Sequence, residues 1–381
     1  MRSFAERFER IVIDPVSSGC NFVFKIGVDN RSSLGRTSMP RPRLAWKDTA
    51  TMNSKYLVAF GVCALASVFG WSAHADSSLE DLTLTTEFAP HGFHAPFYLA
   101  LKNGWYEDAG VNLTIRDGKG TANTINLVGA EQTDVGFTSL GAMAIAVAKG
   151  VPVKAIASIL HRNIYGLILS EGSTLKEPAD FRGKEILYNT SSIEAQVFQG
   201  FLTAGGMSLS DVKMVGVDSS AKVSSVLSGK GDAAVGPVPY YLGLLAGKNE
   251  IETVSFYDFG QKILDFGLIA NDATIEDKAD ALKAFVEVTS RAYQYAIDGH
   301  ADEAVKAIIE LRPDARLDYD TTLAMFESHA KFLDSEDSKG KPVGYMSAAD
   351  WDETVATLKR LELIPASATA SEMYTTEFSP K

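Results

Sequence analysis

Short apolar or alternating segments recur along the chain from residue 82 onward, separated by stretches whose apolar positions have helical spacing. Residues 82–87 (LTLTTE) alternate between apolar and polar side chains, as a half-buried strand does. The next stretch opens at Pro96 and carries Phe97, Leu101 and Trp105 on one helical face. Strands that alternate with short helices predict an α/β fold with mostly parallel sheets and helices on both faces. The further expected strands are residues 111–115, 134–138, 153–159, 165–170, 184–189, 212–217, 232–235 and 263–270.

The alternation of strands and helices occurs in two successive runs, separated near residue 171. Residues 127–136 and 227–236 are weakly similar, since each reads as a helix end, a Gly turn and a short strand. If this similarity is more than chance, it indicates two related lobes. From residue 272 onward the pattern is helical only, which predicts a C-terminal helical tail packed on a lobe already built.

We therefore expect two doubly wound α/β lobes joined by two chain crossings, near residues 169–172 and 268–271. Lobe 1 would comprise residues 76–170 and 271–381, and lobe 2 residues 171–270.

The N-terminal part has the pattern of an export signal. Lys55 precedes an apolar run over residues 56–69, and Ala73-His-Ala75 follows it. A cationic start, an apolar run of this length and an A-x-A ending predict a signal peptide over residues 52–75, cleaved after Ala75. Residues 1–51 would then be a mis-assigned or disordered extension, a long cleaved leader and an uncleaved anchor being the alternatives.

Charge and cysteine content exclude several classes of function for this chain. The chain has a net charge of −12, and setting aside its first 75 residues leaves −17. An acidic chain without a basic stripe is a poor nucleic-acid binder, because affinity for phosphates depends on Lys and Arg. Both cysteines, Cys20 and Cys63, lie before residue 76, so the remainder has no disulfide, thiol nucleophile or cysteine metal ligand. We expect an exported, soluble protein.

Four segments carry a resemblance to a known family: HAPFYLALKNGWYEDAGV at residues 94–111, GAEQTDVG at 129–136, KGVPV at 149–153 and ADFRGK at 179–184. In order and spacing they resemble periplasmic substrate-binding proteins of ABC importers, in the branch covering taurine, alkanesulfonates, nitrate and thiamine-pyrimidine precursors. The resemblance implies a type II periplasmic-binding-protein fold that closes around a small molecule and delivers it to a membrane permease and its ATPase. It implies a monomer of the periplasm and no cofactor.

Ligands of open α/β sheets bind beyond the carboxyl ends of the strands, where helix N-termini gather. This rule selects the loop after the first strand, the strand end near residue 138, and the corresponding loops of lobe 2. The candidate ligand-binding residues are Phe88, His91, His94, Tyr98, Thr138, Ser139, Asn189, Thr190, Ser191, Ser192, Glu194, Pro237 and Tyr240. Tyr240 and its neighbour Tyr241 point to different sides of a helix, so one of them at most is expected to face the cleft.

The pyrimidine-precursor branch resembles this chain in two loops. Pro90 and His94 match its first loop, whereas Phe88 and His91 stand where that branch has Trp and Asn. Residues 188–194 (YNTSSIE) match its second-lobe loop and place Glu194 at a helix start. The selected loops offer no Arg and only Lys119, so we expect Glu194 to accept hydrogen bonds from an amino-heterocycle on which Phe88 or Tyr98 stacks.

Other chemistry has weaker support. His91 and His94 form an H-x-x-H pair, but a metal site needs a third ligand and no further His or Cys is near, so we expect no metal. The remaining alternatives are a binding protein for taurine, another alkanesulfonate or an aromatic carboxylate, and a ligand-sensing lobe for a membrane kinase. A pyrimidine-synthase-like enzyme is disfavoured, because the enzymes that this family resembles depend on cysteines.

Overall fold

The computed structural model describes residues 79–190 and 193–380. These residues belong to one compact unit, residues 72–381, and the following description is of that unit alone. The predicted signal peptide over residues 52–75 and the candidate residues Ser191 and Ser192 lie outside the described residues. No described helix is both long enough and apolar enough to cross a membrane.

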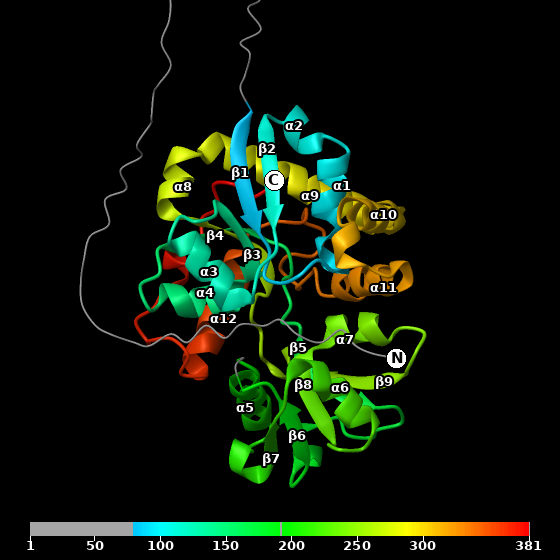
Figure 1. Cartoon of the computed structure of the whole chain (residues 1–381). Helices are drawn as coiled ribbons and strands as arrows, with labels where there is room; N and C mark the ends of the chain where they lie inside the picture. The colour runs from blue at the N-terminus through cyan, green and yellow to red at the C-terminus, as the bar shows by residue number, and fades with distance from the viewer. Residues whose placement is uncertain (1–78, 191–192, 381) are drawn as a thin grey trace, which may run out of the picture. The chain divides into compact units, whose positions relative to one another are not determined.

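Lobe 1 is built on a five-stranded sheet with the order β2-β1-β3-β10-β4 (Figure 1). Its strands are β1 (Glu80–Thr85), β2 (Val111–Arg116), β3 (Val135–Ser139), β4 (Val153–Ser158) and β10 (Phe266–Asn271). β1 runs parallel to β2 and β3, whereas β10 runs antiparallel to β3 and β4. The strand that returns from lobe 2 is therefore the antiparallel member of this sheet.

Lobe 2 repeats the same plan, with the order β7-β6-β8-β5-β9. Its strands are β5 (Tyr165–Ser170), β6 (Glu185–Tyr188), β7 (Lys213–Gly216), β8 (Ala233–Pro237) and β9 (Ile251–Ser255). Here β5, the strand that enters from lobe 1, is antiparallel to β8 and β9. The two similar sequence segments end in β3 and β8, which occupy the third position of their sheets, so the internal similarity corresponds to equivalent places in two related lobes.

The chain crosses between the sheets at residues 159–164 and 256–265, earlier than the sequence predicts. Strand β5 belongs to lobe 2 and β10 to lobe 1, so the expected boundaries after residues 170 and 270 are each about one strand too late. Both strands are apolar and buried throughout their middle positions. Such a pattern predicts a buried strand but carries no information on which sheet the strand joins.

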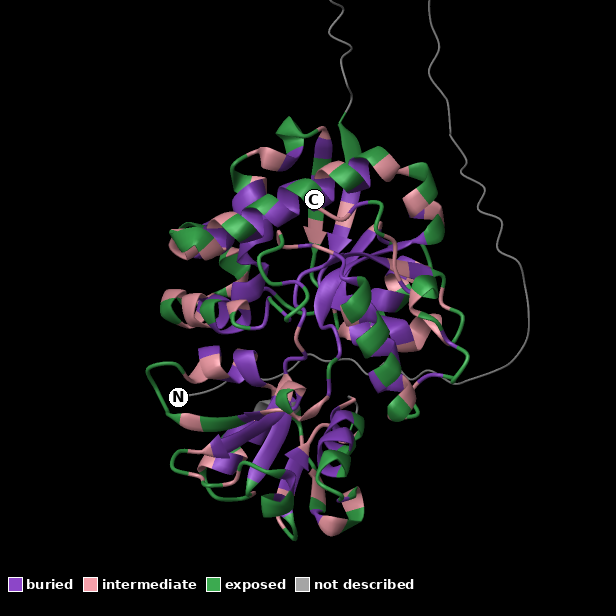
Figure 2. Ribbon diagram, turned by 180° about the vertical axis from the view of Figure 1, so that it is seen from behind, coloured by how far each residue is buried: buried purple, intermediate pink, exposed green. Residues whose placement is uncertain are grey.

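Helices cover both faces of the first sheet, as expected. One hydrophobic cluster joins α1 (Ala95–Lys102), α9 (Ala279–Tyr295), α10 (Ala301–Leu311) and α11 (Tyr319–Ala330) to one face. A second joins α3 (Thr121–Gly129), α4 (Leu140–Val147) and α12 (Ala348–Arg360) to the other. Figure 2 shows the strands between them as buried. The remaining α-helices are α2 (Trp105–Asp108), α5 (Glu194–Ala204), α6 (Ser219–Leu227), α7 (Val238–Leu245) and α8 (Asp272–Asp277).

The helix expected to run from Pro96 through Trp105 is interrupted. Gly104 has φ 71°, a left-handed conformation that ends α1 and lets α2 begin at Trp105. The four-residue spacing of Phe97, Leu101 and Trp105 therefore spans two helices. All three side chains nevertheless contact the same hydrophobic cluster.

Candidate functional site

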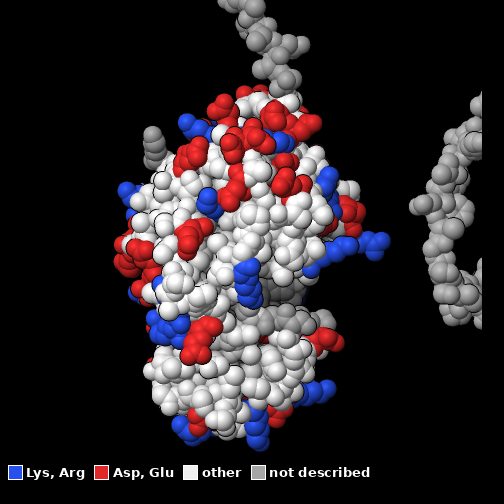
Figure 3. All heavy atoms as spheres, turned by 90° about the vertical axis from the view of Figure 1, so that its left-hand side faces the viewer, with Lys and Arg blue, Asp and Glu red and all other residues white. Residues whose placement is uncertain are grey.

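A cleft of about 740 Å³ lies between the two lobes. Lobe 1 contributes the loop before α3, the N-terminal part of α3, one side of α4 and the segment after α4, while lobe 2 contributes Tyr165, Thr190 and Ile193. Figure 3 shows a notch between the lobes on the side where α3 and α4 lie, bordered mostly by uncharged side chains. The full lining is Lys119, Gly120, Thr121, Ala122, Asn123, Ile125, Asn126, Ser139, Ala142, Ile145, Ala146, Lys149, Val151, Tyr165, Thr190 and Ile193.

The local sequence positions two helix N-termini at this cleft. A Cβ atom on Gly118 would lie 1.8 Å from the Thr86 carbonyl oxygen, so glycine is required where the loop before α3 crosses the end of β1. Gly120 then donates its backbone N–H to the Glu87 carbonyl at 2.8 Å, and α3 begins at the next residue. Ser139 caps α4 by accepting a hydrogen bond from the Ala142 N–H. Both N-termini favour hydrogen-bond acceptors or anions.

The described part of the cleft lining carries cationic but no anionic side chains. Lys119 and Lys149 are exposed at its edge, and none of the described lining residues is Asp or Glu. Hydroxyl and amide groups of Thr121, Asn123 and Ser139 supply the neutral hydrogen-bonding surface. The cleft therefore suits a neutral or anionic polar molecule.

Tyr165 supplies the aromatic ring of this lining, and sequence reasoning missed it. It is the first residue of β5, directly after the crossing from lobe 1. Its hydroxyl has no hydrogen-bond partner among the described residues. Burial, with further contributions from the charges of Asp265 and Glu194, raises the pKa of this phenol, so it stays a hydrogen-bond donor at neutral pH. An aromatic residue at the start of a strand is too common to have identified the site from sequence.

The loop after β1 brings Glu87, His91 and His94 together in the interior. Nε2 of His91 lies 3.0 Å from Oε1 of Glu87, and Nε2 of His94 lies 3.0 Å from Oε2. Burial by itself would raise the pKa of Glu87, but the charges and hydrogen bonds of His94 and His91 outweigh it and hold that pKa well below its usual range. Burial, and then the neighbouring His94, lower the pKa of His91.

Glu194 has a partner that the sequence analysis did not identify. Its Oε1 accepts a hydrogen bond from Nζ of Lys222 at 2.5 Å, and its Oε2 accepts the Asn189 N–H at 2.7 Å. Lys222, on α6, also donates to the Val235 carbonyl at 2.8 Å and lies 5.9 Å from the Tyr241 ring centre. Both charged side chains are buried. The cation comes from a helix 28 residues further along the chain, outside the loops that the sequence analysis selected.

The structure divides the other candidates among several places. Ser139 and Thr190 line the cleft. Tyr240 lies edge-on to His91 with ring centres 6.3 Å apart, whereas Tyr241 packs in lobe 2. Thr138 is fully buried, and its Oγ1 has no hydrogen-bond partner among the described residues; Pro237 precedes α7. Ligand contact by these residues stays a prediction.

The two aromatic residues expected to stack on the ligand lie elsewhere. Phe88 is 54% exposed and is not part of the cleft lining. Tyr98 is buried in lobe 1, and its hydroxyl accepts a hydrogen bond from Arg312 at 3.0 Å. Arg312 also bridges Asp117 and Asp314, which fixes this end of α10 to the loop after β2. Tyr165 therefore replaces them as the aromatic candidate.

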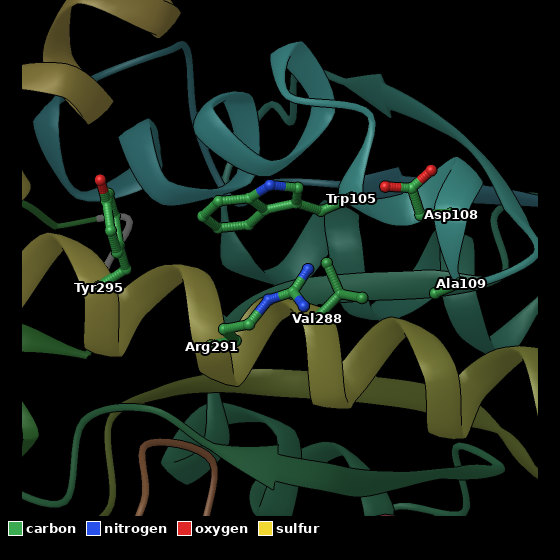
Figure 4. Close-up of a pocket in the computed structure, with 6 residues that line it drawn as sticks. All are labelled: Trp105, Asp108, Ala109, Val288, Arg291 and Tyr295. Atoms are coloured by element: carbon green, nitrogen blue, oxygen red, sulfur yellow. The ribbon is translucent and has the colours of Figure 1, made fainter.

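A second pocket, of about 420 Å³, lies between α2 and α9 and is lined by lobe 1 alone (Figure 4). The Arg291 guanidinium stacks under the Trp105 indole, 4.6 Å from the ring centre, and Tyr295 lies at the other end of that ring. Such a contact stabilises the side chains that form it. Because lobe 2 contributes nothing here, lobe movement would not enclose a ligand in this pocket.

Comparison with known proteins gives three informative matches. A family model described as NMT1/THI5 like matches residues 92–304. The formylaminopyrimidine-binding protein of Halalkalibacterium halodurans is 23% identical over 299 residues, which cover 77% of this chain and 89% of that protein. The 4-amino-5-hydroxymethyl-2-methylpyrimidine phosphate synthase THI12 of Saccharomyces cerevisiae is 22% identical over 318 residues, which cover 79% of this chain and 88% of that protein.

Among solved structures, the periplasmic aliphatic sulphonate binding protein SsuA from Escherichia coli is similar to this chain with a TM-score of 0.62. The two are 13% identical, and the match covers 77% of this chain and 97% of that one. This likeness confirms the predicted fold class, two α/β lobes of the periplasmic-binding-protein type.

Proposed function

Because the chain belongs to the NMT1/THI5-like family, we propose that it is the extracytoplasmic solute-binding component of an ABC importer. In this proposal residues 52–75 direct export to the periplasm, and the protein delivers a small molecule to a membrane permease and its ATPase. The observation that carries the proposal is the cleft of about 740 Å³ lined by both lobes. A volume of this size is typical of small-molecule sites, and two lobes joined by two crossings can close around a ligand by hinge movement.

The proposed ligand is a small amino-heterocycle related to the thiamine pyrimidine precursor. The formylaminopyrimidine-binding relative supports this ligand class. Tyr165 offers a ring to stack on and a hydroxyl to donate, and Thr121, Asn123 and Ser139 offer neutral hydrogen-bonding groups. Glu194 already binds Lys222, so recognition in this proposal depends on the uncharged groups of the lining rather than on that carboxylate.

One observation favours a second ligand class. Lys119, just before the N-terminus of α3, and Lys149, just after the C-terminus of α4, line the cleft, which suits an alkanesulfonate or an aromatic carboxylate. An enzymatic role like that of the yeast synthase is the less supported alternative, because residues 76–381 contain no cysteine.

A thermal-shift and calorimetry screen of the purified protein tests the ligand class. We expect 4-amino-5-hydroxymethyl-2-methylpyrimidine to raise the Tm, since a ligand at 100 times its Kd adds about 2.7 kcal/mol to the free energy of unfolding. Taurine and benzoate are the competing probes. A Tm increase with either of these and none with the pyrimidine would reject the proposed ligand class. No binding by any of the three classes would count against the proposed function itself.

Tyr165→Phe should weaken binding of the ligand without destabilising the empty protein. The substitution removes one hydroxyl that has no described protein partner, so the expected loss is about 0.5–1.5 kcal/mol of binding free energy. Calorimetry of both proteins measures it. Tyr295→Phe is the matched control, because Tyr295 lines the lobe 1 pocket and should leave affinity unchanged. Equal affinity of the Tyr165→Phe and unsubstituted proteins would show that the phenol does not contact the ligand.

A further inference from the structure

Glu87, His91 and His94 converge because of the local backbone. Glu87 lies two residues beyond the end of β1, and the 3₁₀ helix η1 (Gly92–His94) follows His91. Side chains three residues apart eclipse each other in a 3₁₀ turn, which accounts for the distance of only 3.9 Å between the His91 and His94 ring centres. Each of the three residues offers one atom that can coordinate a metal, and these three atoms lie within 4.8 Å of one another. Such a separation lets a single ion reach all three after small side-chain movements.

The surroundings of this cluster offer Glu87 no lysine or arginine partner among the described residues. All three side chains are buried, and His94 is fully so. Among residues 79–190 and 193–380, no Lys or Arg forms an ion pair with Glu87. Nδ1 of His94 is buried and has no hydrogen-bond partner among these residues. A buried polar atom without a partner is uncommon and calls for an explanation.

We infer that Glu87, His91 and His94 form a binding site for a first-row divalent cation, with Zn²⁺ as the representative ion. Two imidazole nitrogens and one carboxylate oxygen are a three-ligand set that zinc accepts in proteins while it keeps a fourth position open. The carboxylate supplies negative charge, and the two neutral imidazoles supply lone pairs. Glu87 is the third ligand that the H-x-x-H pair lacked in sequence, where only His and Cys were considered.

Coordination would rearrange the protons of the cluster. Each histidine now offers its Nε2–H to Glu87, and a metal bound at Nε2 requires that proton to move to Nδ1 of the same ring. His91 would lose the 3.3 Å hydrogen bond that its Nδ1 accepts from the Phe93 N–H. His94 loses no such bond, since its Nδ1 has no partner within residues 79–190 and 193–380.

The site also lies where the two lobes meet. The Tyr240 ring of lobe 2 stands edge-on to His91, and α7 of lobe 2 packs against α11 of lobe 1, so that a Cβ atom on Gly243 would lie 2.4 Å from the Met325 Cα. The His329 ring of α11 stacks on His91 with centres 5.7 Å apart. A cation held by Glu87, His91 and His94 would therefore fix the lobe 1 loop against which lobe 2 packs.

Titration of the EDTA-dialysed protein with Zn²⁺, in competition with a chromophoric chelator, tests the inference. We expect one equivalent to bind, and Glu87→Gln and His94→Gln each to weaken binding by more than about 100-fold, beyond the loss of 10–100-fold typical of an outer-shell partner. His300→Gln, which changes a histidine stacked on Tyr295, is the matched control and should bind as the unsubstituted protein does. Unchanged Zn²⁺ affinity in both cluster variants would overturn the inference.

A second measurement on the unsubstituted protein covers the case in which the cluster variants do not fold. X-ray absorption of the protein loaded with one equivalent of Zn²⁺ should show two imidazoles and oxygen ligands around the ion. An ion coordinated by fewer than two imidazoles, or the absence of a bound equivalent, would reject the site. Neither measurement depends on the organic ligand, so the cation site and the proposed function can fail separately.

Discussion

Glu194→Gln is expected to destabilise the protein by about 3–5 kcal/mol, because it leaves the Lys222 ammonium buried without its counter-charge. Burial lowers the pKa of Lys222, and Glu194 opposes that effect. Without Glu194 the lysine pKa in the folded state falls further below its unfolded value, so the variant should regain stability as the pH rises toward the ordinary lysine pKa. Urea unfolding at several pH values measures both effects.

The double variant Glu194→Gln/Lys222→Met distinguishes the effect of losing the whole ion pair from the effect of leaving one buried charge without its partner. Removing both charges should restore much of the stability, since a buried ion pair replaced by uncharged groups of similar volume is often neutral. Asp302→Asn is the matched control, because Asp302 pairs with Lys306 on the surface and such pairs contribute less than about 1 kcal/mol. If Glu194→Gln changes stability no more than Asp302→Asn, the ion pair does not support the fold.

The unsubstituted protein is expected to lose stability as the pH rises from about 4 to about 7, and Asp265→Asn is expected to abolish this loss. Asp265 ends the second crossing and accepts the Ile164 N–H of the first crossing at 3.2 Å, while its Oδ1 has no partner in the described part of the chain. Burial raises the pKa of its carboxyl from 3.8 to about 7, to which the charge of Glu87 also contributes. Over that interval the folded state keeps a proton that the unfolded state releases, so unfolding becomes easier as the pH rises. The loss in the unsubstituted protein is at most about 4 kcal/mol at 1.36 kcal/mol per pKa unit.

The measurement is the difference in unfolding free energy between variant and unsubstituted protein across pH 4–8. We expect Asp265→Asn to be relatively more stable above pH 7 and to lose that advantage in acid. Asp277→Asn, at an exposed carboxyl on α8, should shift stability by no more than about 0.5 kcal/mol at any pH. A difference curve that does not change with pH would show that Asp265 is ionised normally in the folded protein.

The sequence by itself determined the α/β class, the two lobes and the helical tail. These features follow from local periodicity, since a two-residue or 3.6-residue repeat of apolar positions reflects the structure of one element and its burial. It also indicated the family, because residues 94–111 carry family-like order and spacing. The family match over residues 92–304 confirms that resemblance.

Only the tertiary structure decided which sheet β5 and β10 join, which cation meets Glu194, and which ring lines the cleft. Lys222 reaches Glu194 from α6, and Tyr165 enters the cleft from the first residue of β5. Glu87 was visible four residues before His91, yet its role depends on the η1 turn that brings both imidazoles to it. Each of these contacts joins residues on two different elements. The hydrophobic pattern of each element is complete without the other element, so neither pattern specifies which residue will be the partner. Strand pairing and lobe packing specify it, because they alone set the distance between side chains on different elements.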